Sequence, residues 1–598
     1  MMVHRIAADD GRRAPAHRRP RSRWRTVSVV ARLFMLASLL LACAPTPPAA
    51  PTAAPAAPTA APAAAKPTEA PKPAEAAKPA APAAAAPAAA AKPTEAPAAA
   101  KPTAAPAAAA RVEPKGSITL ALAEEPPMLA AHDATATFSY PVMRNITEAL
   151  LNRDPATNQL APELATKWEQ TNPTTWRFTL RQGVKFHDGT PWNAEAAADA
   201  MNEMLNKENN YRVRTFLGPE IEAKPVSEYV LDLVTAAPDP ILPTRVYFLP
   251  FHSPTARKAR PEDVPIKPIG TGPYKLVEWI KGQHVKITAN PDWWGNGAAD
   301  AGGAASIKDV TFVFRPAREV RAAMVQSGEA ELARWVSQAE CNASPQCKGA
   351  PTVETIFIRL DTMNPTLADR RVREAIALAV DKESITNKIL GGGDLASMLI
   401  RPTVLGSNPA LKPYPYDPAR AKVLIAEAKA AGVPVDAPLT VLARRGAYFG
   451  MEEAVEAVGA MLQQAGLTNI TIQIMEVSKH TEIYNAPKPI DAARGIIAVH
   501  SHGNELLDFG QTVRFYYTCE GRQSTYCNPA VDEMQTRALS LSGAEREKAY
   551  QEIGKQMYDE VITIPIMHPS FYFGMSKRLE WTPRPDGFIL LKEMKLKE

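Results

Sequence analysis

Residues 175–191 read TWRFTLRQGVKFHDGTP, and this stretch is the starting point for the fold class. Trp176–Leu180 alternates apolar and polar side chains, which predicts a half-buried strand. A glycine turn follows, and Val184–Phe186 predicts a further strand. His187–Gly189 is then interpreted as a turn and not as a catalytic dyad, because Asp and Gly are common turn residues.

Strands and helices alternate along the rest of the chain. The same alternation predicts strands at Ile118–Leu122, Val285–Ile287 and Val310–Phe314. Asp369 is placed to cap a helix whose apolar face is Val372, Ile376, Ala379, Val380 and Ile385. Asp417-Pro418 and Asn528-Pro529 each combine an N-cap with Pro at the first helical position. The mixture predicts an α/β fold.

Length and charge limit the alternatives. Residues 112–598 have ordinary globular composition and are too many for one compact core, so two or three lobes are expected. The net charge is +5. Much of the basic excess lies in the N-terminal segment, as Arg5, Arg12, Arg13, Arg18, Arg19, Arg21, Arg23, Arg25 and Arg32. The remainder is close to balanced, so no nucleic-acid partner is predicted.

The N-terminal segment, residues 1–42, is interpreted as a secretion signal. Its apolar run, Leu33–Ala42, is shorter than the about 20 residues that span a bilayer. The run ends in LLAC, which looks like a bacterial lipobox, and Cys43 would then carry a diacylglycerol. The alternative is an incidental cysteine after a simple signal peptide. An acylated Cys43 would anchor the protein to a membrane, since lipid chains contribute about 0.8 kcal/mol per buried CH₂.

Residues 43–111 follow as a stalk made almost wholly of Ala and Pro. Such a composition offers no large apolar side chains for a core and favours extended polyproline II, with a reach of up to about 200 Å. Two close cysteine pairs lie further on, Cys341 with Cys347 and Cys519 with Cys527. In an exported protein they predict two local disulfides; a zinc site is the competing interpretation.

Common enzyme signatures were sought as well. The chain contains no Gly-x-Ser-x-Gly, no phosphate-binding Gly-x4-Gly-Lys-Ser/Thr and no His-Glu-x2-His. No catalytic residue, metal site or cofactor is therefore predicted. Asp381-Lys382 is interpreted as a capping or surface pair, and Gly270–Pro273 as a tight turn with unusual backbone angles.

Four segments, taken in order, carry a family resemblance. They are ITEALL at 146–151 with PELATKW at 162–168 and the stretch at 175–191; PIGTGPY at 268–274 with NPDWW at 290–294; DRRVREAI at 369–376 with AVDK at 379–382; and YDPARAK at 416–422. Together the chain resembles the family 5 extracellular solute-binding proteins of peptide and nickel importers.

The resemblance implies a two-lobed periplasmic-binding-protein type II fold with an extra subdomain in the first lobe. Lobe I would span 112–356 and return at 566–598, with the subdomain at about 150–268, and lobe II would span 357–565. Phe357–Leu360 and Pro565–Met567 are the predicted hinge strands. Closure on a ligand would select the shut state.

The resemblance also indicates where a ligand would lie. Peptide-binding relatives hold an extended peptide between the lobes, with an acid facing its amino terminus, because a buried ammonium needs a partner. The matching region here is 500–509, where Asn504 replaces the expected Asp and the relatives' Trp and Pro are missing. Glu505 and Asp508 are possible substitutes. The departure leaves longer peptides, sugars and other solutes open.

Other residues offer further ligand contacts. His500 and His502 lie one apart on a predicted strand and could share a chelated metal, or they are ordinary polar residues. Aromatic candidates for the cleft, each also a possible core residue, are Trp293, Trp294, Tyr516 and Tyr517.

These features together predict a binding protein and not an enzyme. It would be exported, lipid-anchored on the outer face of the cell membrane and monomeric, and it would hand a small solute to the permease of an ABC importer. An oligopeptide is the first expected solute, with a chelated metal such as nickel or an oligosaccharide as the alternative. The alternative functional classes are a stalked adhesin and a sensor-type binding protein.

Overall fold

The computed structural model describes residues 112–130, 139–209, 211–485 and 488–597. The predicted signal segment, Cys43 and the stalk lie outside these ranges. Within them, no helix is both long and apolar enough to cross a membrane.

One twelve-stranded sheet runs through both lobes. Its first-lobe half contains β8 (Tyr274–Ile280), β9 (His284–Ala289), β10 (Ile307–Phe314), β1 (Lys115–Leu122), β11 (Leu332–Val336) and β12 (Gln346–Pro351). Its second-lobe half contains β16 (Ile470–Met475), β15 (Leu439–Arg444), β17 (Ile496–Gly503), β13 (Glu354–Leu360) and β14 (Gly393–Leu395). The strands predicted at Ile118–Leu122, Val285–Ile287 and Val310–Phe314 are β1, β9 and β10.

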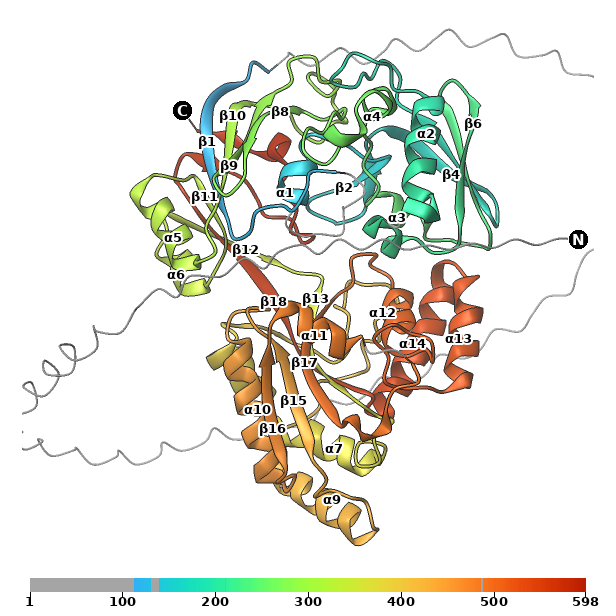
Figure 1. The fold of residues 1–598 in the computed structure, drawn as a ribbon, viewed down its shortest axis with the longest axis vertical. Helices are drawn as coiled ribbons and strands as arrows, with labels where there is room; N and C mark the ends of the chain where they lie inside the picture. The colour runs from blue at the N-terminus through green and yellow to red at the C-terminus, as the bar shows by residue number, and fades with distance from the viewer. Residues whose placement is uncertain (1–111, 131–138, 210, 486–487, 598) are drawn as a thin grey trace, which may run out of the picture. The chain divides into compact units, whose positions relative to one another are not determined.

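A single long strand, β18 (Thr563–Met575), belongs to both halves, and Figure 1 shows it running from one lobe into the other. Its start pairs with β13 and its end with β12 and β11. The predicted hinge strands therefore pair with each other inside the second lobe. The chain crosses between the lobes just beyond them, at Thr352 and at His568-Pro569.

Arg401 holds the two crossing segments together. Its Nε donates to the Thr352 carbonyl, and its Nη2 donates to the carbonyls of His568 and Pro569 at 3.2 and 2.8 Å. One buried guanidinium thus satisfies carbonyl groups of both segments at the level where they leave the sheet.

The second-lobe sheet is covered on both faces. Along β13, Ile356 and Ile358 face a core built with α7 (Arg370–Ala379), α9 (Pro418–Ala430) and α10 (Met451–Ala465). Phe357 faces the opposite core, with α12 (Phe509–Tyr516), α13 (Pro529–Leu539) and α14 (Gly543–Asp559). This alternation is the two-residue period of a strand. Figure 1 shows the two helix groups on opposite sides.

The first lobe carries a separate four-stranded antiparallel sheet, in the order β4 (Ala165–Asn172), β5 (Thr175–Leu180), β7 (Val230–Thr235) and β6 (Ile221–Ser227). Helix α2 (Ala194–Leu205) covers it. Remaining elements of this lobe are α1 (Tyr140–Met143), β2 (Leu151–Arg153), β3 (Leu160–Pro162), α3 (Leu242–Val246), α4 (Pro254–Ala259), α5 (Arg318–Ser327), α6 (Gln338–Asn342), β19 (Leu579–Glu580) and β20 (Lys595–Leu596). The second lobe adds α8 (Lys382–Ser384) and α11 (Val477–Tyr484).

Two local predictions need correction. Val184–Phe186 is not a strand; only Lys185 forms a bridge, with Pro191, because the turn at His187–Gly189 folds the segment back on itself. The helix after Asp369 is shorter than its predicted apolar face, since it ends at Ala379 and Val380 is extended. Ile385 lies in the next helical turn.

The predicted caps are present. Asp369, Asp417 and Asn528 accept hydrogen bonds from the first-turn backbone of α7, α9 and α13. Asp381 caps α8 in the same way, but Lys382 is not a surface residue. Its buried ammonium donates to the Ala377 and Val380 carbonyls at 2.6 and 3.0 Å.

Gly270 and Gly272 are required for close approach and not, as predicted, for unusual backbone angles. Neither has a positive φ. A Cβ on Gly270 would lie 2.2 Å from the Ile146 carbonyl oxygen, and one on Gly272 would lie 2.7 Å from that of Asn145. Two segments with recognisable motifs therefore pack backbone to backbone.

The buried carboxylate of Glu148 accepts hydrogen bonds from side chains of the same motifs. Glu148 accepts from the indole N–H groups of Trp293 and Trp294 at 3.0 and 2.9 Å and from the Thr271 hydroxyl at 2.8 Å. Glu163 lies beside it, paired with Arg144 at 2.9 Å and with Lys592 at 3.4 Å. Burial, and then the charge of Glu163, raises the pKa of Glu148 to about 7.

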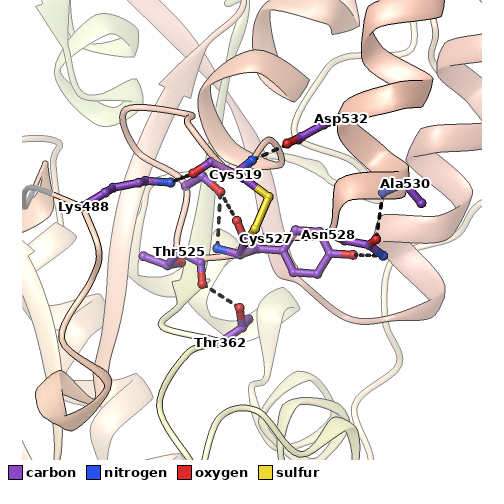
Figure 2. Close-up of a disulfide and its surroundings, with 10 residues drawn as sticks. Thr362, Lys488, Cys519, Thr525, Cys527, Asn528, Ala530 and Asp532 are labelled. Carbon is purple, nitrogen blue, oxygen red and sulfur yellow. Dashed lines mark hydrogen bonds between the residues drawn. A yellow bond between two sulfur atoms is a disulfide. The ribbon is translucent and has the colours of Figure 1, made fainter.

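Both close cysteine pairs are joined, Cys341 to Cys347 and Cys519 to Cys527. Figure 2 shows the second bridge between Lys488, which donates to the Cys519 carbonyl, and Asp532, which accepts from the Cys519 N–H at 3.0 Å. The Thr362 hydroxyl donates to the Thr525 carbonyl at 2.6 Å, so the closed loop is fixed against the segment that follows β13.

We expect Gly270→Ala to lower the free energy of unfolding by ~3 kcal/mol, because the new methyl group overlaps a backbone carbonyl that has little room to move. Gly183→Ala is the matched control. Its φ is +75° but its surroundings are open, so only backbone strain of ~1 kcal/mol should appear. Urea denaturation of both variants measures the difference; equal losses would contradict the close-approach role.

Candidate functional site

A cavity of about 660 Å³ lies between the lobes, beside the crossing segments. The first lobe contributes the residue pair Ala123-Glu124 and the N-terminal ends of α5 and α6. The second lobe contributes Glu354 and Ser501 from paired strands, and Arg444 and residues 446–449 at and beyond the end of β15. β18 supplies one wall through Phe571 and Tyr572. A molecule in this space would touch both lobes and the β18 crossing at Pro569.

Arg444 is the main cationic group that the second lobe brings to the cavity. Its Nε is buried and donates no hydrogen bond, and its guanidinium forms no ion pair with any described residue. Burial raises the pKa of two carboxyls that line the cavity, Glu124 and Glu354, and the charge of Arg444 opposes both rises. An arginine placed so can bind a planar anion such as a carboxylate through two parallel hydrogen bonds.

Glu354 is the acidic residue that lines the cavity from the second lobe, the lobe that also supplies Arg444. Burial raises the pKa of Glu354, while hydrogen bonds from Tyr448 and Ser501 and the charge of Arg444 oppose that rise. Burial likewise raises the pKa of Glu124 across the cleft. Both carboxyls would be better ionised beside a bound cation, since opposite charge favours the charged form.

Aromatic rings form the rest of the wall. Trp335 lines the cavity with a left-handed backbone, φ +56°, which is strained for a bulky residue. Its ring lies 4.6 Å from that of Phe571 and 3.7 Å from the Arg334 guanidinium. From the other lobe, Phe449 meets the Arg318 guanidinium at 4.1 Å. The cavity thus combines charged poles with flat apolar surface.

The nine residues predicted as ligand contacts lie elsewhere. Asn504 is fully buried, and its amide holds the 504–508 loop by bonding to Asp508 and Thr512. Asp508 caps α12 and pairs with the buried Arg546 at 2.7 Å. Glu505 accepts from Gln511 at 2.9 Å, and burial raises its pKa to about 7. Their contact roles stay predictions.

The histidines and aromatic residues predicted as ligand contacts also interact with other side chains of the protein. His502 meets the Thr512 hydroxyl at 2.7 Å, and the His500 ring stacks on Tyr484 at 4.1 Å. Tyr516 and Tyr517 are core residues of the second lobe. Trp293 and Trp294 belong to the Glu148 network. Among the residues described, no group of three or more His, Cys, Asp or Glu side chains could hold a metal ion.

Ser501 is the one residue within 500–509 that reaches the cavity. It lies between the two predicted histidines, on the opposite face of β17, as strand alternation requires. Arg444, Glu354, Tyr448 and Trp335 carried no sequence signal. They come from three separate segments that only the folded chain brings together.

The loop that the resemblance pointed to makes contacts between the lobes. Leu506 is 4% exposed and packs in the first-lobe core with Tyr247 and Phe588. Beside it, Arg153 donates to the Glu505 carbonyl at 2.7 Å. Arg514 of α12 donates to the Leu217 carbonyl at 3.3 Å. These contacts hold the lobes together next to the cavity.

Two lobes joined by two crossing segments, with a walled cavity between them, define a solute-binding protein. The family model for bacterial extracellular solute-binding proteins, family 5 Middle, matches residues 159–521. That match covers more than half of the chain, which therefore belongs to this family. It is an extracytoplasmic binding protein and not an enzyme, and the predicted two-lobed fold is confirmed.

Individual family members are similar to this chain in sequence or in fold. The chain is 26% identical over 443 residues to the nickel-binding periplasmic protein of Escherichia coli, covering 69% of this chain and 82% of the relative. It is 28% identical over 303 residues to that organism's dipeptide-binding protein, covering 46% and 55%. The solved Helicobacter pylori protein DppA with the peptide STSA shares the fold, with a TM-score of 0.68, 19% identity, and 82% and 99% coverage.

We expect Leu506→Ala to open the ligand-free protein, because it removes an apolar side chain worth about 1.5–3 kcal/mol when buried from the contact between the lobes. Small-angle scattering should show a larger radius of gyration. Val423→Ala, at a position on α9 that is 47% exposed, is the control and should leave the radius unchanged. An unchanged radius for the Leu506 variant would exclude this contact as a determinant of closure.

Proposed function

We propose that this protein captures short peptides in the cavity between its lobes and delivers them to the permease of an ABC importer. One observation carries the proposal: the half-buried Arg444, which forms no ion pair with any described residue, faces a cavity that also presents Glu354 and Glu124. A peptide has a carboxylate that can bind Arg444 and an ammonium that can bind the two glutamates. Relatives named as dipeptide- and di/tripeptide-binding proteins support this choice.

The acid that faces the ammonium would be Glu354. Asn504 stands where peptide-binding relatives place an acid, and its amide is occupied within its own loop. Glu354 lies on the neighbouring strand, directly opposite Gly503. It reaches the cavity from nearly the same place and restores the negative charge that a sealed ammonium site needs.

A metal chelate is the second candidate. One relative is named as nickel-binding, and a solved Staphylococcus aureus protein NikA in complex with Ni(L-His)2 shares the fold, with a TM-score of 0.65 and 17% identity. The carboxylates of such a chelate would suit Arg444 as well. Nickel with and without histidine, and oligosaccharides, therefore belong in the same ligand screen.

The first experiment is calorimetric titration of the purified protein with dipeptides and tripeptides. We expect Arg444→Gln to weaken peptide binding about 10- to 100-fold, because a charge-assisted hydrogen bond contributes about 1.5–3 kcal/mol. Arg445→Gln is the matched control. Arg445 pairs with Glu452 and Glu476 at the surface, so its loss should change affinity less than about twofold. Equal affinities for both variants would overturn the proposed site.

Binding should also release protons. Burial raises the pKa of Glu354, so this carboxyl takes up a proton at a higher pH than an ordinary glutamate; a bound ammonium favours the carboxylate and expels the proton. Affinity should therefore fall as the pH drops through the raised pKa. Titrations in buffers of different ionisation enthalpy measure the release. Glu354→Gln should abolish it, and an N-acetylated peptide should not produce it.

We also propose that Cys43 is lipidated and tethers the monomeric protein to the outer face of the membrane through the Ala/Pro-rich stalk. The LLAC motif after a short apolar run supports this. Cys43→Ser should move the protein from the membrane fraction to the soluble fraction of the producing cells. Retention of the variant in washed membranes would argue against the lipid anchor.

A further inference from the structure

The 660 Å³ cavity proposed to bind peptides is called the peptide cavity below. A second cavity, of about 390 Å³, also lies between the lobes and is called the outer cavity. One wall comes from the first-lobe segments around Gly218 and Ile241, and the other from α12, α13 and the start of α14. None of its lining residues lines the peptide cavity. Leu506, buried against the first lobe, forms part of its wall, so the 504–508 loop separates the two spaces.

This outer cavity has one uncompensated positive charge. Three arginines line it, and two of them have acidic partners: Arg245 pairs with Asp239 at 2.7 Å, and Arg546 with Asp508 at 2.7 Å. Arg514 has no ion pair among the described residues and makes a single hydrogen bond, to the Leu217 carbonyl. Arg514 is an exposed residue at the mouth of this cavity. Partial burial of its guanidinium, and then the charge of Arg245, lowers its pKa, and a bound anion would oppose that effect.

A buried amide lines the same space. Gln535 is 5% exposed and donates weakly, at 3.3 Å, to the Gly510 carbonyl. Its Oε1 accepts no hydrogen bond from any described residue. Such buried acceptors are rare, and each needs an explanation such as a bound polar group. The remaining wall is largely apolar, formed by Leu506, Phe515 and Leu539.

We propose that the outer cavity is a second solute site, for a small carboxylate with a short apolar body. The carboxylate would bind Arg514, the apolar body would lie against Leu506, Phe515 and Leu539, and a hydroxyl or amide N–H on the solute would satisfy Gln535. Because the walls belong to both lobes, an occupant stabilises the closed arrangement. The site does not depend on the peptide assignment of the main cavity.

The test uses hexanoate as the probe, with hexylamine and hexanol as matched compounds, and titrates each by calorimetry into the full chain. We expect saturable binding of hexanoate and at least tenfold weaker binding of the other two. Arg514→Gln should weaken hexanoate at least tenfold. Leu539→Trp places a large ring in the cavity from a position that is 40% exposed and tolerates bulk, so it should abolish binding.

Two further measurements separate this site from the peptide cavity. Arg444→Gln, which should impair peptide binding, should leave hexanoate affinity within twofold of the unsubstituted protein. A saturating peptide should likewise not compete with hexanoate. Undiminished hexanoate binding by the Leu539→Trp protein, competition by peptide, or no binding of hexanoate at all would each overturn the second site, whatever the outcome of the peptide titrations.

Discussion

The buried carboxylate of Glu148 is the interaction on which the first lobe depends. A carboxylate removed from water is tolerated only when donors replace its hydration, and here two indoles and a hydroxyl do so. Those donors come from segments more than 120 residues further along the chain. Satisfying one carboxyl therefore fixes the 268–274 turn and the 290–294 segment against 146–151.

Glu163 extends this constraint to the end of the chain. Its burial favours the neutral form, but Arg144 and Lys592 outweigh that effect and lower its pKa. Lys592 lies in the segment that returns to the first lobe after β18, so the network also fixes the final part of the chain. β18 itself emerges from the second lobe, and its position sets one wall of the peptide cavity. None of the residues of this network lines the peptide cavity itself.

This dependence explains which features could be predicted from sequence. Helix caps such as Asp417 depend on neighbours within a few residues, so they were predictable. The family motifs also follow from strict packing, as at Gly270, and they identified the family and its fold. Arg444 and Glu354 obey no local rule: their role arises because β15 and β13 end at the same cavity. Val184–Phe186 shows the opposite error: the local pattern predicts a strand there, but the turn at His187–Gly189 folds the segment back and leaves only a single bridge.

The 504–508 loop links specificity to closure. The family resemblance leads us to expect an acid at Asn504; in the structure Asn504 instead bonds to the backbone of its own loop, and Leu506 packs in the first-lobe core. Contacts between lobes that form without ligand reduce the free energy a ligand must supply to keep them shut. A loop that contributes to closure therefore raises affinity for any solute that fits, and discrimination between solutes falls to the charged groups of the cavity.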